Sequence, residues 1–150
     1  MAHLQAKPIV SKVVCYVIQD GHLLVFTHDE VPIEVAGVQV PAGSIEPGES
    51  PEAAAVREVL EETGLRTTVA EFLGRERYDI SPARNEVAVR HFFRLTVDSP
   101  METTARWTAG DPAPSAGGTW PPRWTCWWLP VENGHVLAAG LGARLGSMYP

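Results

Sequence analysis

Apolar residues gather along the chain in short stretches that predict a succession of β-strands. Residues 10–18 carry apolar side chains in both alternating registers, which is typical of a strand buried on both faces. Residues 19–21 (Gln-Asp-Gly) predict a turn, so residues 22–27 should return as the second strand of a hairpin. Further strands are predicted at residues 67–73, 75–80, 86–97 and 124–129.

The strand predicted at residues 86–97 shows the clearest alternation. One register holds apolar side chains and a histidine, namely Val87, Val89, His91, Phe93 and Leu95. The other register holds the charged residues Glu86, Arg90 and Arg94. The pattern predicts one face against the core and one face in solvent, with His91 as a hydrogen-bonded core residue.

One helix has well-marked ends. Ser50 is a good N-cap, Pro51 suits the first helical position, and Glu52 favours the positive end of the helix dipole. Gly64 is a natural residue just beyond the C-terminal end. Residues 51–63 are therefore expected to be helical, with an apolar stripe toward the core made of Val56, Val59, Leu60 and Thr63.

The remaining stretches predict connecting segments and a single domain. We expect a loop with a short strand at residues 28–40, a Pro- and Gly-rich loop at 41–48, and a long loop at 107–122 of functional or mobile character. Residues 135–145 predict a weak helix diluted by glycine. A chain of 150 residues is of ordinary single-domain size, so residues 1–150 are expected to share one core.

Three glutamates stand close together on the second half of the predicted helix. Glu58, Glu61 and Glu62 occupy positions i, i+3 and i+4, where like charges repel by about a few tenths of a kcal/mol per pair. A hard divalent cation, Mg²⁺ or Mn²⁺, would compensate this repulsion. The alternatives are a solvated acidic face and a structural or calcium-binding helix. Arg57, which can hold a carboxylate by two hydrogen bonds, and Glu49 in the preceding loop favour the cation site.

The charge is unevenly distributed. The formal net charge is −6, and residues 46–62 hold six glutamates and one arginine, which makes −5 there. This balance excludes the basic surface of a duplex nucleic-acid binder. Residues 75–94 contain five arginines, and an acidic cluster beside a basic stretch suits a cation together with phosphate groups.

Other features bear on the cellular compartment. The apolar runs are too short to cross a bilayer and the N-terminus lacks a signal-peptide pattern, so we expect a cytoplasmic protein that does not bind membranes. Cys15 and Cys126 are expected to be buried free thiols.

Residues 43–65, GSIEPGESPEAAAVREVLEETGL, fit the pattern G-x5-E-x7-R-E-U-x-E-E-x-G-U, where U is aliphatic. All nine specified places are filled, by Gly43, Glu49, Arg57, Glu58, Val59, Glu61, Glu62, Gly64 and Leu65. Nine fixed positions over 23 residues are a highly specific match. On them the chain resembles the Nudix hydrolase family, and we call residues 43–65 the Nudix box.

The resemblance implies an α/β fold of the Nudix type, an α/β/α sandwich with a mixed sheet. It also implies a pyrophosphohydrolase that depends on Mg²⁺ or Mn²⁺ and cleaves a nucleoside diphosphate linked to another group. The implied metal ligands are Glu58, Glu61, Glu62 and the carbonyl of Ala42, which stands where many members have a second glycine.

The resemblance also assigns roles in the reaction. The implied catalytic residues are Glu58, with general-base character, Glu61, and Arg57, which orients a carboxylate. Which glutamate is the base stays open. Gly43 and Glu49 are implied to support the loop.

The substrate is less determined than the reaction. A nucleoside triphosphate, a nucleotide sugar and a dinucleoside polyphosphate all stay open, and so do monomer and homodimer. The candidate substrate contacts are Arg75, Arg77 and Arg84 for phosphates, and Trp107 and Trp120 for stacking on a base. Trp124 and Trp128 share a strand face and are predicted to lie in the core.

A second hypothesis is a catalytically silent Nudix-fold module that binds a nucleotide for regulation. Such modules usually lose glutamates or the arginine of the box. The box is complete here, which favours the enzyme.

Overall fold

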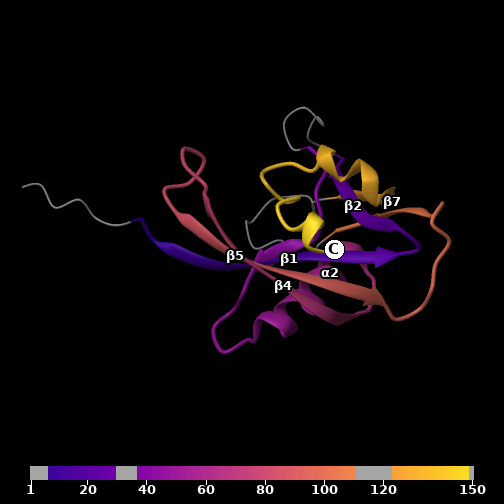
Figure 1. Cartoon of the computed structure of the whole chain (residues 1–150), viewed down its shortest axis with the longest axis horizontal. Helices are drawn as coiled ribbons and strands as arrows, with labels where there is room; N and C mark the ends of the chain where they lie inside the picture. The colour runs from indigo at the N-terminus through magenta and orange to yellow at the C-terminus, as the bar shows by residue number, and fades with distance from the viewer. Residues whose placement is uncertain (1–6, 30–36, 111–122, 149–150) are drawn as a thin grey trace, which may run out of the picture.

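The computed structural model describes residues 7–29, 37–110 and 123–148, and it is built on a mixed sheet of seven strands (Figure 1). The strands are β1 (Ile9–Gln19), β2 (His22–His28), β3 (Ala42–Ser44), β4 (Thr67–Asp79), β5 (Val87–Val97), β6 (Arg106–Ala109) and β7 (Trp124–Pro130). The helical elements of the described part are α2 (Pro51–Thr63) and two 3₁₀ turns, η1 (Val131–Val136) and η2 (Leu145–Met148). This arrangement confirms the predicted mixed α/β fold.

Strand β1 divides the sheet into two diverging halves. It runs parallel to β5 along nine residue pairs, whereas it pairs with β2 only at Ile18–Leu23 and Gln19–His22, next to the hairpin turn. The sheet order is β4-β5-β1-β2-β7-β6, with β3 beside β1. The segment leading into β3 fills the space between β1 and β2, because Cys15 N–H donates to Pro41 O and Phe26 N–H donates to Gln39 O. The chain before the helix is thereby held at the centre of the molecule.

Both faces of the sheet are covered, as the pattern of residues 10–18 predicted. Val13, Cys15 and Val17 pack on the α2 side, whereas Val14 and Tyr16 pack on the opposite side. Figure 1 shows α2 on one side of β1 and the C-terminal segment on the other. The predicted strands at 67–73 and 75–80 form one strand, β4, which passes through Gly74 with irregular pairing.

Helix α2 begins and ends as predicted. The Ser50 hydroxyl accepts a hydrogen bond from Ala53 N–H at 3.1 Å, and Gly64 caps the C-terminal end at φ 79°. The predicted apolar stripe is partly wrong, because Leu60 is 38% exposed. The buried helix residues are Ala54, Ala55, Val59 and Thr63. Leu60 follows Val59 by one residue, about 100° around the helix, and so lies outside the buried face.

The helix predicted at residues 135–145 is wrong. The segment forms η1, a series of turns and η2, because Ala139 (φ 53°) and Gly140 (φ 72°) adopt left-handed conformations that end a right-handed helix. Among the described residues, this turn-rich segment is therefore the layer opposite α2. The Tyr16 hydroxyl donates to Leu141 O and ties the segment to β1.

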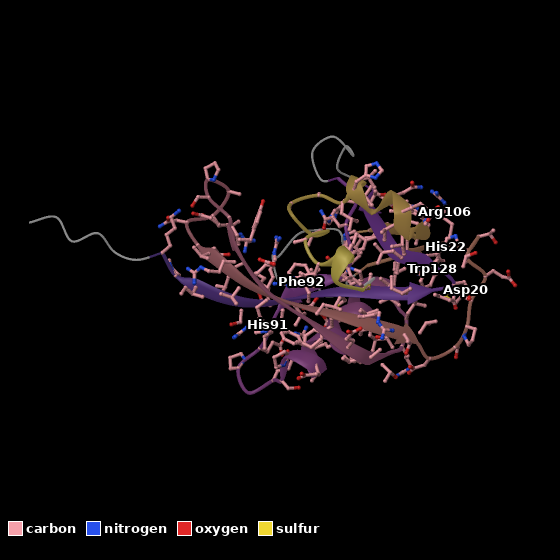
Figure 2. The ribbon with its side chains drawn as sticks, viewed as in Figure 1. Asp20, His22, His91, Phe92, Arg106 and Trp128 are labelled. Carbon is pink, nitrogen blue, oxygen red and sulfur yellow. The ribbon has the colours of Figure 1, made fainter. Side chains whose placement is uncertain are left out.

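The faces of β5 also differ from the prediction. Phe93 packs toward α2, but Phe92 is equally buried on the other face, so the register that contains Arg90 does not lie in open solvent. His91 is only partly buried, and Figure 2 shows it across β5 from Phe92. Burial and the nearby Arg75 lower the pKa of His91. His91 therefore lies between the core and the solvent, and its predicted place in the core is wrong.

The predictions for the loop, the thiols and the tryptophans have mixed outcomes. Residues 107–109 belong to β6, so the predicted 107–122 loop is wrong at its start, and residues 111–122 lie outside the described part. Cys15 and Cys126 are buried and free, as predicted. Trp124 and Trp128 are buried, as predicted. In the described ranges, no helix is both long and apolar enough to span a bilayer.

Candidate active site

Arg57 joins the loop before α2 to the glutamates on that helix. Its Nε and Nη2 donate to the two oxygens of Glu49, each at 2.8 Å. Its Nη1 donates to Glu58 Oε1 at 2.9 Å and to Glu61 Oε2 at 3.2 Å. Nη2 also donates to Ser44 O at 3.0 Å. One guanidinium therefore fixes three carboxylates and the end of β3.

The electrostatics of this cluster follow from the same contacts. The hydrogen bonds from Arg57 lower the pKa of Glu49 to about 2. The reciprocal contact with Glu49 raises the pKa of Arg57, which keeps the guanidinium charged. Glu49 and Arg57 are therefore both ionised at neutral pH, and their ion pair holds the loop against the helix.

Glu58 and Glu62 are two adjacent, partly buried carboxylates of the cluster. Ala42 N–H donates to Glu62 Oε1 at 3.2 Å, which connects this carboxylate to the start of β3. Burial, and then contact with Glu58, raises the pKa of Glu62 well above its usual range. Burial also raises the pKa of Glu58. Two adjacent carboxylates in this position favour a bound proton or cation.

Gly43 is required by the position of Glu58. A Cβ atom built on Gly43 would overlap the carboxyl group of Glu58. The absence of a side chain at Gly43 thus lets the helix carboxylate approach the backbone of β3 closely.

These carboxylates line a cavity of about 840 Å³, which we call the carboxylate cavity. Its walls are Phe26, His28, Gln39, Ala42, Ser44, Glu46, Arg57, Glu58, Glu61, Glu62, Arg84 and Trp124. The cavity lies where β1 and β2 diverge, so residues from both halves of the sheet reach it.

The family model that describes the NUDIX domain matches residues 9–133, which is most of the chain. The chain belongs to the NUDIX family. This membership confirms the sequence prediction of a Nudix hydrolase, and the residues matched include the complete Nudix box.

The relatives of this Nudix chain agree with its fold. An RNA pyrophosphohydrolase from Dinoroseobacter shibae is 39% identical over 75 residues, a match that spans 47% of this chain and 47% of that protein. The chain thus matches about half the length of that relative. A NUDIX hydrolase structure from Nitrosomonas europaea has a TM-score of 0.65 at 24% identity, covering 95% of this chain and 88% of the other. The structure of a MutT NUDIX hydrolase from Burkholderia pseudomallei has a TM-score of 0.65 at 18% identity, covering 93% of this chain and 97% of the other.

The structure separates the predicted substrate residues. Arg84 lines the carboxylate cavity. Arg75 and Arg77 are exposed on β4 and do not line it. Trp120 lies outside the described residues.

Trp107 does not line the carboxylate cavity, so the predicted stacking role has no structural basis there. Its Nε1 donates to Thr63 O at 2.8 Å, and its ring centroid lies 6.5 Å from that of Trp128. These contacts make Trp107 a packing residue that joins β6 to the end of α2.

The cavity also contains residues that sequence reasoning missed, notably His28 at the end of β2. Trp124 Nε1 donates to His28 Nδ1 at 2.7 Å. Because an indole N–H is only a donor, Nδ1 must accept, and the neutral ring then carries its proton on Nε2. Only the pairing of β2 with β7 brings this histidine to Trp124, and nothing in the sequence spacing indicated it.

The donor set fits a hard cation that keeps part of its water shell. Among the residues with described positions, no three His, Cys, Asp or Glu side chains converge at metal-binding distances. The partly buried Glu58–Glu62 pair nevertheless presents carboxylate oxygens, the ligand type that Mg²⁺ and Mn²⁺ prefer, and these ions commonly bind through few protein ligands.

Proposed function

We propose that the chain is a metal-dependent pyrophosphohydrolase that cleaves a nucleoside diphosphate linked to another group, with the carboxylate cavity as its active site. The observation that supports it most is the hydrogen-bonding of Arg57 to Glu49, Glu58 and Glu61 at the wall of that cavity. A regulatory module would not need this set to be complete. The family membership supports the same reaction class.

The metal ligands in this proposal are Glu58, Glu61, Glu62 and the carbonyl of Ala42. When bound, Mg²⁺ or Mn²⁺ would neutralise phosphate charge and make a water molecule easier to deprotonate near neutral pH. Gly43 leaves the room that the Glu58 carboxyl group needs beside β3.

Other roles in the reaction, proton transfer and phosphate binding, belong to side chains of the carboxylate cavity. Glu58 accepts the proton of the attacking water, and Arg57 holds its carboxylate in place at 2.9 Å. Arg84, whose side chain is 70% exposed, binds phosphate oxygens at the mouth of the cavity. His28 donates from Nε2 to a phosphate oxygen, with its ring oriented by Trp124.

A substrate panel tests the proposal. The panel contains nucleoside triphosphates, nucleotide sugars, ADP-ribose and dinucleoside polyphosphates, each with Mg²⁺ and Mn²⁺ and with release of phosphate and pyrophosphate as the readout. A 5′-triphosphorylated oligonucleotide is added because the Dinoroseobacter shibae relative is named an RNA pyrophosphohydrolase. Turnover that needs the cation supports the proposal, whereas nucleotide binding without any turnover would establish the regulatory module.

A further inference from the structure

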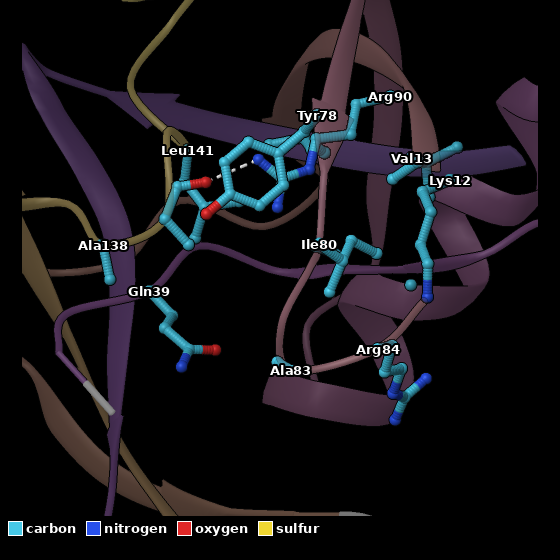
Figure 3. A pocket seen from close by; sticks show the side chains of 15 residues that line it. Lys12, Val13, Gln39, Tyr78, Ile80, Ala83, Arg84, Arg90, Ala138 and Leu141 are labelled. Atoms are coloured by element: carbon cyan, nitrogen blue, oxygen red, sulfur yellow. Dashed lines mark hydrogen bonds between the residues drawn. The ribbon is translucent and has the colours of Figure 1, made fainter. Parts of the chain in front are cut away.

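A second cavity lies beside the carboxylate cavity, between β1, β4, β5 and the C-terminal segment (Figure 3). We call it the Tyr78 cavity; its volume is about 540 Å³. Gln39, Ala42 and Arg84 line both cavities. A ligand can therefore place one part beside the carboxylates and another part beside Tyr78.

Arg90 is the unusual residue of the Tyr78 cavity. Its guanidinium carbon lies 4.0 Å from the centroid of the Tyr78 ring, and its Nη1 donates to Ala139 O at 2.6 Å. Figure 3 shows the guanidinium against the face of this ring. Two independent contacts, one from β4 and one from the C-terminal segment, thus fix its plane.

Among the described residues, the charge of Arg90 has no acidic partner. Within the described ranges, no carboxylate forms an ion pair with it, and partial burial lowers its pKa. Arg90 lines the cavity, and within the described ranges its hydrogen bond uses Nη1, whereas Nε and Nη2 form no hydrogen bond with another described residue. An oriented, half-buried cation with open donors is suited to a ligand edge that carries hydrogen-bond acceptors.

The position of Arg90 favours a base over a phosphate as that ligand. In the proposed function, the phosphates would be bound by Arg84 at the shared wall and by the cation that Glu58, Glu61 and Glu62 would hold in the carboxylate cavity. Two N–H groups of one guanidinium donate well to the adjacent N7 and O6 atoms of guanine. Adenine instead presents an amine, which is a donor, next to N7. We propose, on the basis of the proposed function, that Arg90 makes this hydrolase selective for nucleotides of guanine or hypoxanthine by donating to O6 and N7.

The test compares kcat/KM for GTP, ITP, ATP and the GTP analogue that lacks N7. The native chain is expected to favour GTP and ITP over ATP by about tenfold or more, and the analogue to lose most of this advantage. Arg90→Met should reduce GTP and ITP to the level of ATP. Arg90→Lys should restore only part of the preference, because an ammonium group does not have the two coplanar N–H donors that contact O6 and N7 together.

Arg106→Met is the matched control. Arg106 also stacks on an aromatic ring, with its guanidinium carbon 5.2 Å from the Trp127 centroid, but it lies on β6 at the far edge of the sheet and lines neither cavity. The control should keep the preference for GTP. Circular dichroism and thermal melts of each variant establish that it is folded.

Two results would overturn the proposal. The first is an equal loss for all four nucleotides in Arg90→Met, which would mean a contact to sugar or phosphate. The second is a native chain with no preference among the bases. Calorimetric binding of GMP, IMP and AMP decides the role of Arg90 separately from catalysis: if no substrate turns over, the proposed function fails, but tighter binding of GMP and IMP would still support base selection.

Discussion

The Nudix box and the Tyr78 cavity are neighbouring regions that are assembled in different ways. The functional side chains of the box come from 23 consecutive residues, and one helix with its preceding loop places them. The Tyr78 cavity takes Lys12 from β1, Tyr78 from β4, Arg90 from β5 and Ala139 from the C-terminal segment. The Nudix box can therefore be identified from the sequence, whereas the Tyr78 cavity forms only when distant segments come together in the folded chain.

The arginines of the two regions also have different partners. In the box, one arginine is shared among several carboxylates, so removing a single member disturbs all the others. In the Tyr78 cavity, Arg90 is held by an aromatic ring and a carbonyl, without an acidic partner in the described part of the chain. Substitutions should therefore change turnover in the first region and substrate preference in the second.

The largest effect is expected for Glu58→Gln. Turnover of the best substrate should fall by at least about 10²-fold, because the carboxylate charge is lost while the side-chain volume is kept. Steady-state kinetics measure the loss. Glu71→Gln is the control, since Glu71 lies on the edge strand β4, pairs only with Arg94 in the described structure, and should leave turnover unchanged.

A smaller loss is expected for Arg57→Lys. Lysine keeps the positive charge but cannot contact both oxygens of Glu49 and also reach Glu58 and Glu61. Turnover should fall by about 10- to 100-fold, the range typical of residues that orient metal ligands. Kinetics at saturating Mg²⁺ are the measurement, and an unchanged kcat would show that positive charge alone is sufficient.

Trp107→Phe should affect stability and not substrate binding. The substitution removes the 2.8 Å hydrogen bond to Thr63 O, and the free energy of unfolding should fall by about 1 kcal/mol. Urea denaturation gives this value. A several-fold rise in KM would instead support the stacking role predicted from the sequence.

The metal-free protein should also show a pH dependence of stability. The folded state raises the pKa of Glu62 above its ordinary 4.5, so the folded chain keeps a proton that the unfolded chain releases. The free energy of unfolding should therefore decline as pH rises above the ordinary value, and the decline ends once Glu62 is deprotonated in the folded state.

Glu62→Gln removes this contribution, so the variant should be as stable as the native chain at low pH and more stable at neutral pH. Urea denaturation with a chelator, between about pH 4 and about pH 8, measures the two curves. A Gln variant that is less stable at neutral pH would mean that the Glu62 carboxylate is a structural partner.

The sequence by itself determined the features that depend on short-range spacing. The ends of α2 follow from Ser50 and Gly64, and the Nudix box follows from nine residues within one loop and helix. Helical periodicity alone puts Glu58, Glu61 and Glu62 on neighbouring positions, whatever the rest of the chain does. The burial of β1 on both faces was likewise visible in its two apolar registers.

The tertiary structure decided everything that depends on which segments meet. Residues 135–145 turn at Ala139 and Gly140 and cover β1 and β5 through Leu141 and Ala139, and these long-range contacts are not contained in any local pattern. The same covering layer converts the charged register of β5 into a cavity wall that contains Arg90. Trp107 and His28 acquired their roles in the same way, from partners more than 40 residues away. A side chain's local pattern sets its direction, but the segment that packs against it sets its environment, and with it its chemistry.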